Sequence, residues 1–271
     1  MSRPVLVGSA LAILPLLHAS SAHAWCRTTT DPTTPATPND CITTGEPLYW
    51  ATRCQSFSLD AQGGGGLDFA TVRSAVTASF DTWNAVTCGS APVFSVVETA
   101  VTVDCQNAEY SSTDGNSNTI AFISDFGARM YPDAIAVTIV WHNQNTGQIY
   151  DADMMINEAY GPFAQCSGAC LPNETKFDLQ NTVTHEAGHF LGLAHSGVTN
   201  STMFYSATPG ETSKRTLAAD DIAGLCDAYG DAVSRIPVLS REDETALATR
   251  FRSENDLDAA RQLVLSHLRF V

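Results

Sequence analysis

Three histidines and one glutamate stand at a spacing that suits metal chemistry, within residues 185–195, which read HEAGHFLGLAH. On a helix, His185 and His189 project from the same face one turn apart, so both imidazoles can reach one tetrahedral zinc ion. Glu186 is rotated by about 100° from His185, which places it beside the metal without aiming it at the metal. The pattern therefore predicts two zinc ligands and a carboxylate able to take a proton from water.

Gly192 and His195 complete the pattern. Glycine adopts backbone conformations that are closed to residues with a Cβ atom, so Gly192 lets the chain turn sharply and bring His195 back as a third ligand. Three protein ligands leave one coordination position open, which is typical of catalytic rather than structural zinc. The alternative is that these are ordinary helix histidines that only form hydrogen bonds. In that case five fixed positions of the pattern would match by coincidence, and three of the five are histidine, a rare residue.

The pattern resembles the extended zinc-binding signature of the metzincin peptidases. Ser196, directly after the third histidine, resembles the matrixin branch of matrix metalloproteinases and their bacterial relatives, whereas other branches carry Glu or Asp there. Met203, eight residues after His195, resembles the methionine of the turn that underlies the metal in this clan, the Met-turn. The resemblance extends from Pro47 to about Gly230.

This resemblance implies an α+β fold: a small mixed twisted sheet, an active-site helix, a Met-turn and a C-terminal helix. It also implies a secreted zinc endopeptidase that hydrolyses peptide bonds in protein substrates. His185, His189 and His195 would hold one catalytic zinc ion, and Glu186 would be the general base. The expected partner is a protein or peptide in extended conformation, paired with an edge strand near Ile135–Trp141.

The chain departs from the matrixin pattern at the expected second metal site. Matrixins usually carry His-x-Asp there for a structural zinc, whereas residues 150–153 read YDAD with His142 nearby. We therefore expect one zinc ion rather than two. Asp151 and Asp153 could instead help bind calcium, which prefers hard oxygen ligands. The alternative is an acidic strand end exposed to solvent.

The chain departs from the matrixin pattern in two further places, at the specificity pocket and at the propeptide motif that keeps animal matrixins inactive. Phe204-Tyr205 follow the Met-turn methionine where the family commonly has Tyr-Pro, which leaves the wall of the specificity pocket undefined. The Pro-Arg-Cys-Gly propeptide motif of animal matrixins is absent, and Cys26 is expected to be a disulfide partner rather than its substitute.

Two other classes of function stay open. One is a binding or adhesion module that keeps zinc for structure, which is expected to lack the glutamate that this chain carries at 186. The other is a zinc hydrolase that acts on an ester or amide of a small molecule. An assay with a protein substrate separates that class from a peptidase.

The first 24 residues are expected to be a secretory signal. Arg3 precedes the apolar run Val5–Leu17, and small residues before Trp25 predict cleavage after Ala24. The alternative, a membrane anchor, is disfavoured because the run is too short to span a bilayer. No later segment of the sequence is apolar enough to cross a membrane.

Cysteine content and charge agree with an extracellular protein. All eight cysteines follow the signal, and an even number in an exported chain predicts disulfides, whose pairing stays open. Zinc binding by thiolates is disfavoured, because the chain has no Cys-x-x-Cys pair. The net charge of −15 argues against nucleic acid or an anionic membrane as a partner.

Apolar periodicity predicts the elements around the motif. Strands are expected at Cys54–Leu59, Val93–Val97, Thr119–Ile123, Ile135–Trp141 and Ile149–Ile156, the last two joined by a hairpin turn. A helical core stripe is formed by Phe69, Val72, Val76, Phe80 and Trp83. Further helices are expected at Asp178–Leu191 and Ala218–Tyr229.

These elements divide the chain into four parts. We expect a signal at 1–24, a flexible or disulfide-tethered leader at 25–45, a matrixin-like protease domain at 46–231 and a helical tail at 232–271. The tail has Ser240 as a candidate N-cap and an apolar side formed by Leu257, Leu263, Val264 and Leu268. It either docks on the domain or stands alone.

Overall fold

The computed structural model describes residues 25–89, 92–129, 133–166, 170, 175–230 and 241–254. The predicted signal and the apolar side of the tail lie outside these residues, as does the candidate N-cap Ser240. The strands are β1 (Cys26–Arg27), β2 (Tyr49–Trp50), β3 (Cys54–Leu59), β4 (Ser95–Glu98), β5 (Thr119–Ile123), β6 (Ala136–His142), β7 (Gln148–Asn157) and β8 (Leu193–Ala194). The helices are α1 (Phe69–Asn84), α2 (Phe126–Arg129), α3 (Leu179–Phe190), α4 (Ala219–Tyr229) and α5 (Arg241–Glu254), with 3-10 turns η1 (Glu158–Tyr160) and η2 (Ser213–Arg215).

Six strands form one mixed sheet in the order β2-β7-β5-β3-β4, with β6 paired to β7. The neighbours along this order are parallel, whereas β6 runs antiparallel to β7. The turn Asn143–Gly147 joins β6 to β7, and a hydrogen bond of 2.9 Å from the Gly147 amide to the Asn143 carbonyl closes it. Within the described residues β6 pairs with β7 alone, so its other edge is free to pair with another chain.

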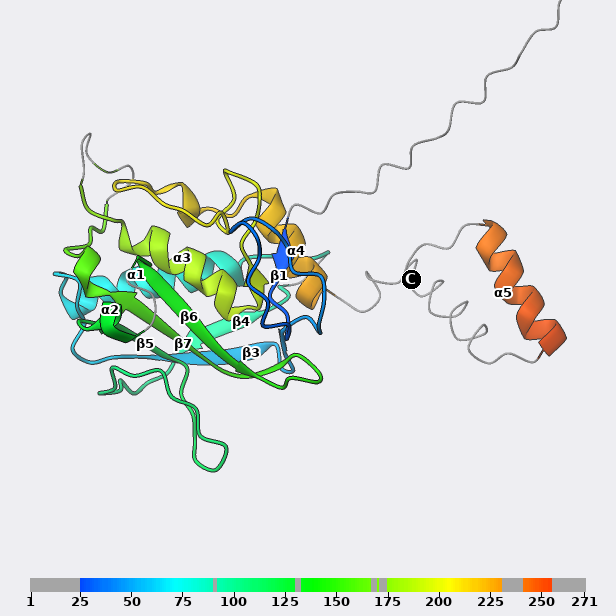
Figure 1. Ribbon diagram of the computed structural model, residues 1–271, viewed down its shortest axis with the longest axis horizontal. Helices are drawn as coiled ribbons and strands as arrows, with labels where there is room; N and C mark the ends of the chain where they lie inside the picture. Colours follow the sequence, from blue (N-terminus) through cyan, green and yellow to red (C-terminus); the bar gives the residue numbers. More distant parts are fainter. Residues whose placement is uncertain are drawn as a thin grey trace, which may run out of the picture.

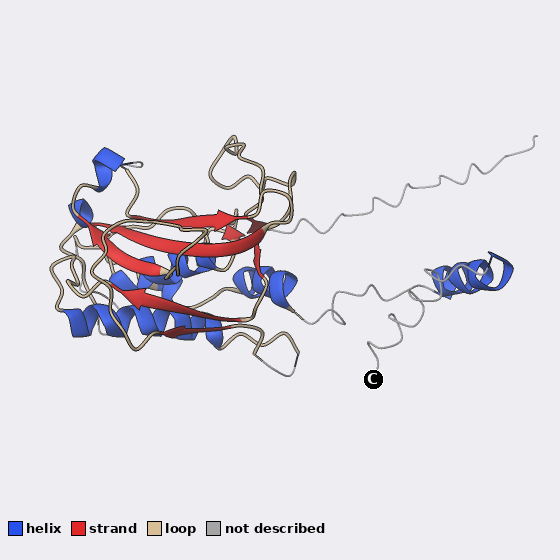
Figure 2. Ribbon diagram, turned by 90° about the horizontal axis from the view of Figure 1, so that it is seen from below, coloured by secondary structure: helices blue, strands red, loops and turns tan. Residues whose placement is uncertain are grey.

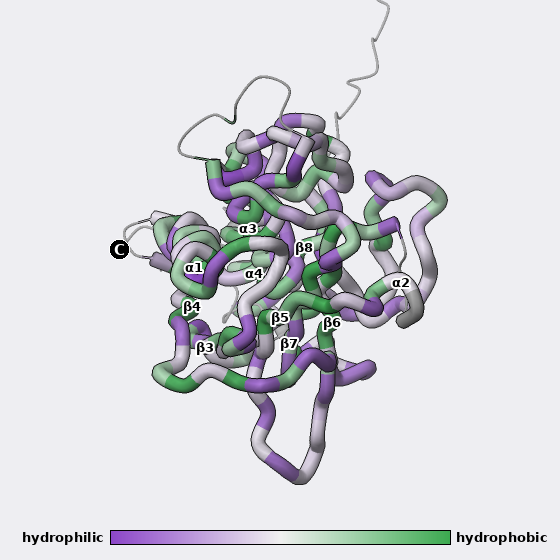
Figure 3. The backbone as a smooth tube through the Cα atoms, turned by 90° about the vertical axis from the view of Figure 1, so that its left-hand side faces the viewer, coloured by the Kyte–Doolittle hydropathy of each residue, from purple (hydrophilic) through white to green (hydrophobic). Residues whose placement is uncertain are grey.

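Helices α1 and α3 lie side by side on one face of the sheet (Figure 1 and Figure 2). Val72, Val76 and Phe80 of α1 are buried in the main core together with Trp83, as the predicted stripe requires. The indole N–H of Trp83 donates to the carbonyl of Thr184 at 2.8 Å, which ties α1 to α3. Figure 3 shows hydrophobic segments inside the fold and hydrophilic ones on its outer loops.

The predicted elements around the motif are confirmed with small shifts of their ends. Strands β3 and β5 begin and end as expected, and β4 begins two residues later than predicted. The expected α+β class is also confirmed, because α1 and α3 cover a mixed, mostly parallel sheet. In the described part of the chain, no helix is long and apolar enough to cross a membrane.

Six of the cysteines form disulfides: Cys26–Cys41, Cys88–Cys226 and Cys166–Cys170. The prediction that every cysteine is paired is wrong for Cys54 and Cys105, which are free. Cys54 begins β3, whereas Val103 lies beside the far end of that strand, with its amide donating to Leu59. At about 3.3 Å per strand residue, the strand separates the two thiols by far more than a disulfide allows.

Alkylation of the folded, unreduced protein is expected to label two cysteines, and reduction is expected to raise the number to eight. Cys54 should react first, because it is exposed, whereas the thiol of Cys105 is partly covered and donates to the carbonyl of Asn107 at 3.5 Å. Intact-mass analysis with peptide mapping checks this. An unlabelled protein before reduction would mean that both thiols are oxidised in solution.

Candidate metal centre

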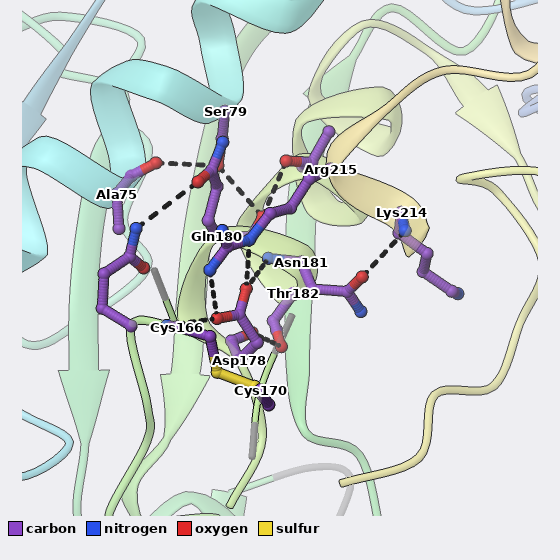
Figure 4. A network of polar contacts seen from close by, with 12 residues as sticks. Ala75, Ser79, Cys166, Cys170, Asp178, Gln180, Asn181, Thr182, Lys214 and Arg215 are labelled. Atoms are coloured by element: carbon purple, nitrogen blue, oxygen red, sulfur yellow. Dashed lines mark hydrogen bonds and ion pairs between the residues drawn. A yellow bond between two sulfur atoms is a disulfide. The ribbon is translucent and has the colours of Figure 1, made fainter. Parts of the chain in front are cut away.

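Helix α3 is fixed at its start by Asp178. Its carboxylate accepts a hydrogen bond from the amide of Asn181 at 2.8 Å, the standard N-terminal cap. The same carboxylate is buried and pairs with the guanidinium of Arg215, whose Nε lies 2.8 Å from Oδ1 (Figure 4). Asp178 also accepts the amide of Cys166 at 3.1 Å, so it joins the helix to two loops.

The three predicted histidines come together. His185 and His189 lie on α3, and His195 follows β8; one ligand atom from each lies within 4.8 Å of the others. The Nδ1 atoms of His185 and His189 lie 2.7 and 2.8 Å from the carbonyls of Thr202 and Leu193. A carbonyl can only accept, so each Nδ1 carries the proton and each Nε2 is free to bind a metal.

The histidines are held in the form that binds metals. Burial lowers the pKa of His189 to about 4 and that of His195 to about 3, and it places the pKa of His185 well below its usual value. Neutral imidazole is the ligand form of histidine. The three rings are therefore neutral at physiological pH, with ring centroids 4.9, 5.2 and 4.9 Å apart.

Glu186 lies beside this cluster and is 5% exposed. Burial raises its pKa to about 7, against the lowering effect of a hydrogen bond from Thr138 and of the Lys214 charge. The hydroxyl of Thr138, on β6, donates to Oε2 of Glu186 at 2.8 Å. A carboxylate with a pKa near neutrality can both accept and return a proton at physiological pH.

Met203, which resembles the methionine of the Met-turn, is buried and lies against Gly188 of α3. Its amide and that of Thr202 both donate to the carboxylate of Asp221 on α4, at 3.0 and 2.8 Å. Gly188 allows the close packing: a Cβ there would collide with Met203 Sδ and lie 2.9 Å from the Trp83 ring. Met203 and Trp83 thus pack directly against α3 at Gly188.

Gly192 turns the chain as predicted. Its φ is +84°, and a Cβ atom there would lie 2.6 Å from the carbonyl oxygen of Leu48. Its amide donates to the carbonyl of His189 at 2.9 Å, which ends the helix. The chain then enters β8 and reaches His195.

The N-terminal segment, residues 25–48, borders the histidine cluster. Strand β1 pairs antiparallel with β8, and the amide of Thr28 donates to the Gly192 carbonyl at 3.0 Å. The carbonyl of Pro38 accepts a hydrogen bond from the His195 ring. The Cys26–Cys41 disulfide closes the loop that contains Pro38.

A cavity of about 1060 Å³ contains the cluster. It is lined by the three histidines and Glu186, by residues 135–140 along β6, by residues 205–207 after the Met-turn and by parts of the N-terminal segment. The cavity therefore follows the edge of β6 that is unpaired within the described residues, and it passes the three histidines. Tyr205 lies over His195, with ring centroids 6.4 Å apart.

Asp151 and Asp153 lie apart from this site, on β7. Both are buried, so they do not form the exposed strand end that was the alternative to calcium binding. Asp153 accepts the amides of Thr119 at 2.6 Å and Glu109 at 2.9 Å, whereas Oδ2 of Asp151 has no hydrogen-bond partner. Within the described chain neither belongs to a group of three candidate metal ligands.

The free energy of unfolding is expected to fall as pH rises, in part because of Asp151. Burial, aided by the charge of Asp153, raises its pKa from 3.8 to about 7. A raised folded-state pKa stabilises the fold at low pH, and this contribution, on the order of 4 kcal/mol, is lost as pH rises from about 4 to about 7. Asp151→Asn should remove most of this loss in denaturant melts at pH 5 and pH 8.

Calcium provides the control for this prediction. If the two carboxylates bind calcium, the ion should raise the parent's melting temperature at pH 8 and leave Asp151→Asn unchanged. Without such binding, neither protein responds. An identical pH dependence in parent and variant would contradict the assignment to Asp151.

Several residues that hold the histidines and Glu186 in place were not predicted from the sequence. Thr138 contacts Glu186, and Asp221 contacts Met203, although the partners are far apart in the sequence. Neither Thr138 nor Asp221 belongs to a local sequence motif. Asp178 had a signal, since it stands where a helix N-cap is expected. Gly188 lies inside the motif, but its role depends on Met203 and Trp83, which only the fold brings to it.

Comparison with known proteins agrees with this geometry. Residues 49–230 match the matrixin family. The chain is 35% identical over 88 residues to Metalloendoproteinase 1-MMP and 38% identical over 88 residues to Metalloendoproteinase 5-MMP, both of Arabidopsis thaliana. It is 44% identical over 59 residues to Metalloendoproteinase 1 of Glycine max.

Each match is confined to part of either protein. The matched stretches cover 31%, 31% and 22% of this chain, and 24%, 23% and 19% of the respective relatives. The chain thus spans about a quarter or less of the length of these relatives. The family match covers most of the chain, from β2 to the end of α4. With its histidine cluster and buried Met203 in place, the chain belongs to the matrixin family.

Proposed function

We propose that this protein is a secreted, zinc-dependent metalloendopeptidase that hydrolyses peptide bonds of protein substrates. One observation carries the proposal: three neutral histidines converge beside the buried Glu186, in a cavity along an unpaired strand edge. Membership of the matrixin family and the names of the matched relatives support it. The disulfides support an extracellular location.

His185, His189 and His195 would hold one zinc ion. Their Nε2 atoms fit the donor set of a three-histidine catalytic site, and carbonyl partners orient the rings of His185 and His189. When bound, zinc lowers the pKa of a water molecule and polarises a substrate carbonyl. The other described group of three candidate ligands contains the Cys166–Cys170 disulfide, which supports a single ion.

Glu186 moves the proton in this proposal. Its Oε2 accepts a hydrogen bond from Thr138, which holds the carboxylate beside the histidines. The carboxylate takes a proton from the attacking water and delivers it to the departing amine. Burial favours the first of these steps, because the raised pKa makes the carboxylate a stronger base, and a pKa near 7 still allows the proton to be returned.

The substrate would lie extended along β6. Backbone groups on the free edge of this strand can pair with a peptide, and residues 135–140 line the cavity beside Glu186. Recognition through backbone hydrogen bonds accommodates many sequences, so selectivity depends on the side-chain pockets next to the scissile bond.

Mass-spectrometric profiling of a peptide library, beside a casein or gelatin assay, tests the proposal. We expect internal cleavage that requires the metal, with about one zinc ion per chain by elemental analysis after dialysis. Hydrolysis of small esters without any cleavage of peptides or proteins would favour the small-molecule hydrolase. Full zinc occupancy without hydrolysis of any substrate would favour the binding module.

A further inference from the structure

A buried cation lies in the same cavity as the candidate metal ligands. Lys214, in η2, is 4% exposed and lines the cavity. Its backbone amide donates to Oδ1 of Asn181 at 2.8 Å, which fixes η2 against α3 (Figure 4). The next residue, Arg215, is also a cation, but it pairs with Asp178.

The ammonium group of Lys214 has one hydrogen-bond acceptor among the described residues. It donates one hydrogen bond, to the carbonyl of Phe204. Its other neighbour is Nδ1 of His185 at 3.4 Å, but this nitrogen carries a proton that it donates to Thr202, so it cannot accept. A lysine ammonium has three donors, so two have no protein acceptor within the described part of the chain.

The charge of Lys214 also has no carboxylate in direct contact among the described residues. Glu186, Glu211 and Asp221 act on it electrostatically, yet no ion pair joins it to any of them. Glu211 and Asp221 accept hydrogen bonds from other groups, among them the hydroxyl of Ser213. A buried ammonium that lacks a carboxylate partner is costly, so an anion entering the cavity would be bound strongly.

The position of Lys214 determines what that anion can be. Its Nζ lies on the Nδ1 side of His185, away from the Nε2 that faces the other histidines, so it is not placed to contact the reacting carbonyl. One imidazole ring separates it from the metal-binding nitrogen. Since successive Cα atoms are about 3.8 Å apart, the side chains of residues directly beside the scissile bond are the nearest to this group.

The geometry points to Lys214 as a specificity determinant that selects substrates with a glutamate or aspartate next to the scissile bond. This inference rests on the proposed peptidase function. The substrate carboxylate would accept the two free N–H groups of Lys214 and form a charge-assisted pair inside the cavity. The opposing view is that Lys214 has only a structural role, tying η2 to the segment after the Met-turn through the Phe204 carbonyl.

Peptides that differ in one residue beside the cleavage site test the assignment. We expect kcat/KM for the Glu peptide to exceed that for its Gln and Leu counterparts by about 10-fold or more, as for a hydrogen bond to a charged group. In Lys214→Met, which keeps the length of the side chain, the ratio of Glu to Gln should fall to about one. Lys214→Arg keeps the charge and should keep part of the preference.

A matched control removes the same charge elsewhere. Lys176 is exposed, and Lys176→Met should leave the Glu-to-Gln ratio at the parent value. A purely structural role predicts that Lys214→Met loses thermal stability while the ratio stays unchanged. Such a result, or a parent without any preference for Glu, would overturn the inference while leaving the peptidase function standing.

Binding measured without turnover keeps the two proposals distinguishable. Zinc-loaded Glu186→Gln can be titrated calorimetrically with the Glu and Gln peptides, alone and combined with Lys214→Met. Tighter binding of the Glu peptide that disappears with Lys214→Met supports the role of Lys214 even if the parent cleaves nothing. Equal affinities for the two peptides would overturn that role.

Discussion

Glu186→Gln is expected to lower peptide hydrolysis by at least about 10²–10⁴-fold while zinc binding and folding stay nearly intact. The amide has the shape of the carboxylate and can still accept the hydrogen bond from Thr138. It cannot accept a proton, and in the proposed mechanism this one side chain serves both proton transfers. Rate assays on a single peptide substrate, with zinc content measured on the same samples, check the prediction.

Thr138→Val is the graded control for this result. It removes the hydroxyl that donates to Glu186 and keeps a β-branched residue on β6, so a partial loss of rate is expected. A Gln variant that hydrolyses peptides as fast as the parent would show that Glu186 is not the base.

Gly188→Ala, a substitution within α3, is expected to lower the stability of the protein and to weaken metal binding. Alanine normally stabilises a helix interior by about 0.5–1 kcal/mol relative to glycine. Here the added methyl group would collide with the buried Met203 side chain and approach the Trp83 ring to 2.9 Å. Overpacking of this kind typically costs about 1–3 kcal/mol, so stability should fall where helix propensity alone predicts a gain.

The displacement of α3 should also weaken metal binding, because His185 and His189 lie on that helix. Calorimetric unfolding and a zinc competition titration measure the two effects. Gly197→Ala is the matched control, since the nearest atom to its added Cβ would be the carbonyl oxygen of Asn39 at 3.8 Å. If both variants have the melting temperature of the parent, Met203 does not pack against the helix at Gly188.

The sequence predicted the parts of the site that depend on local spacing. His185 and His189 share a helical face because four residues make about one turn, and Gly192 marks the end of that helix by its conformational freedom. Strand β7 and its hairpin partner were predicted from apolar runs on either side of a polar turn. These features need no knowledge of the rest of the chain.

The remaining parts depend on contacts between distant segments. Thr138 reaches Glu186 only because β6 packs beside α3, and Asp221 reaches Met203 only because α4 returns to the Met-turn. The free state of Cys54 likewise follows from its position at one end of β3. No periodicity or local spacing in the sequence predicts such contacts, so they are known only from the three-dimensional structure.

Removing and restoring the metal tests whether peptide hydrolysis depends on zinc held by the three histidines. The purified protein would be stripped with a chelator, dialysed and assayed for cleavage of one protein and one peptide before and after zinc is restored. We expect hydrolysis to disappear with the metal and to return as zinc approaches one ion per chain, with no recovery in a stripped variant carrying His195→Ala. Hydrolysis that persists in the zinc-free protein would show that the protein is not a zinc-dependent peptidase.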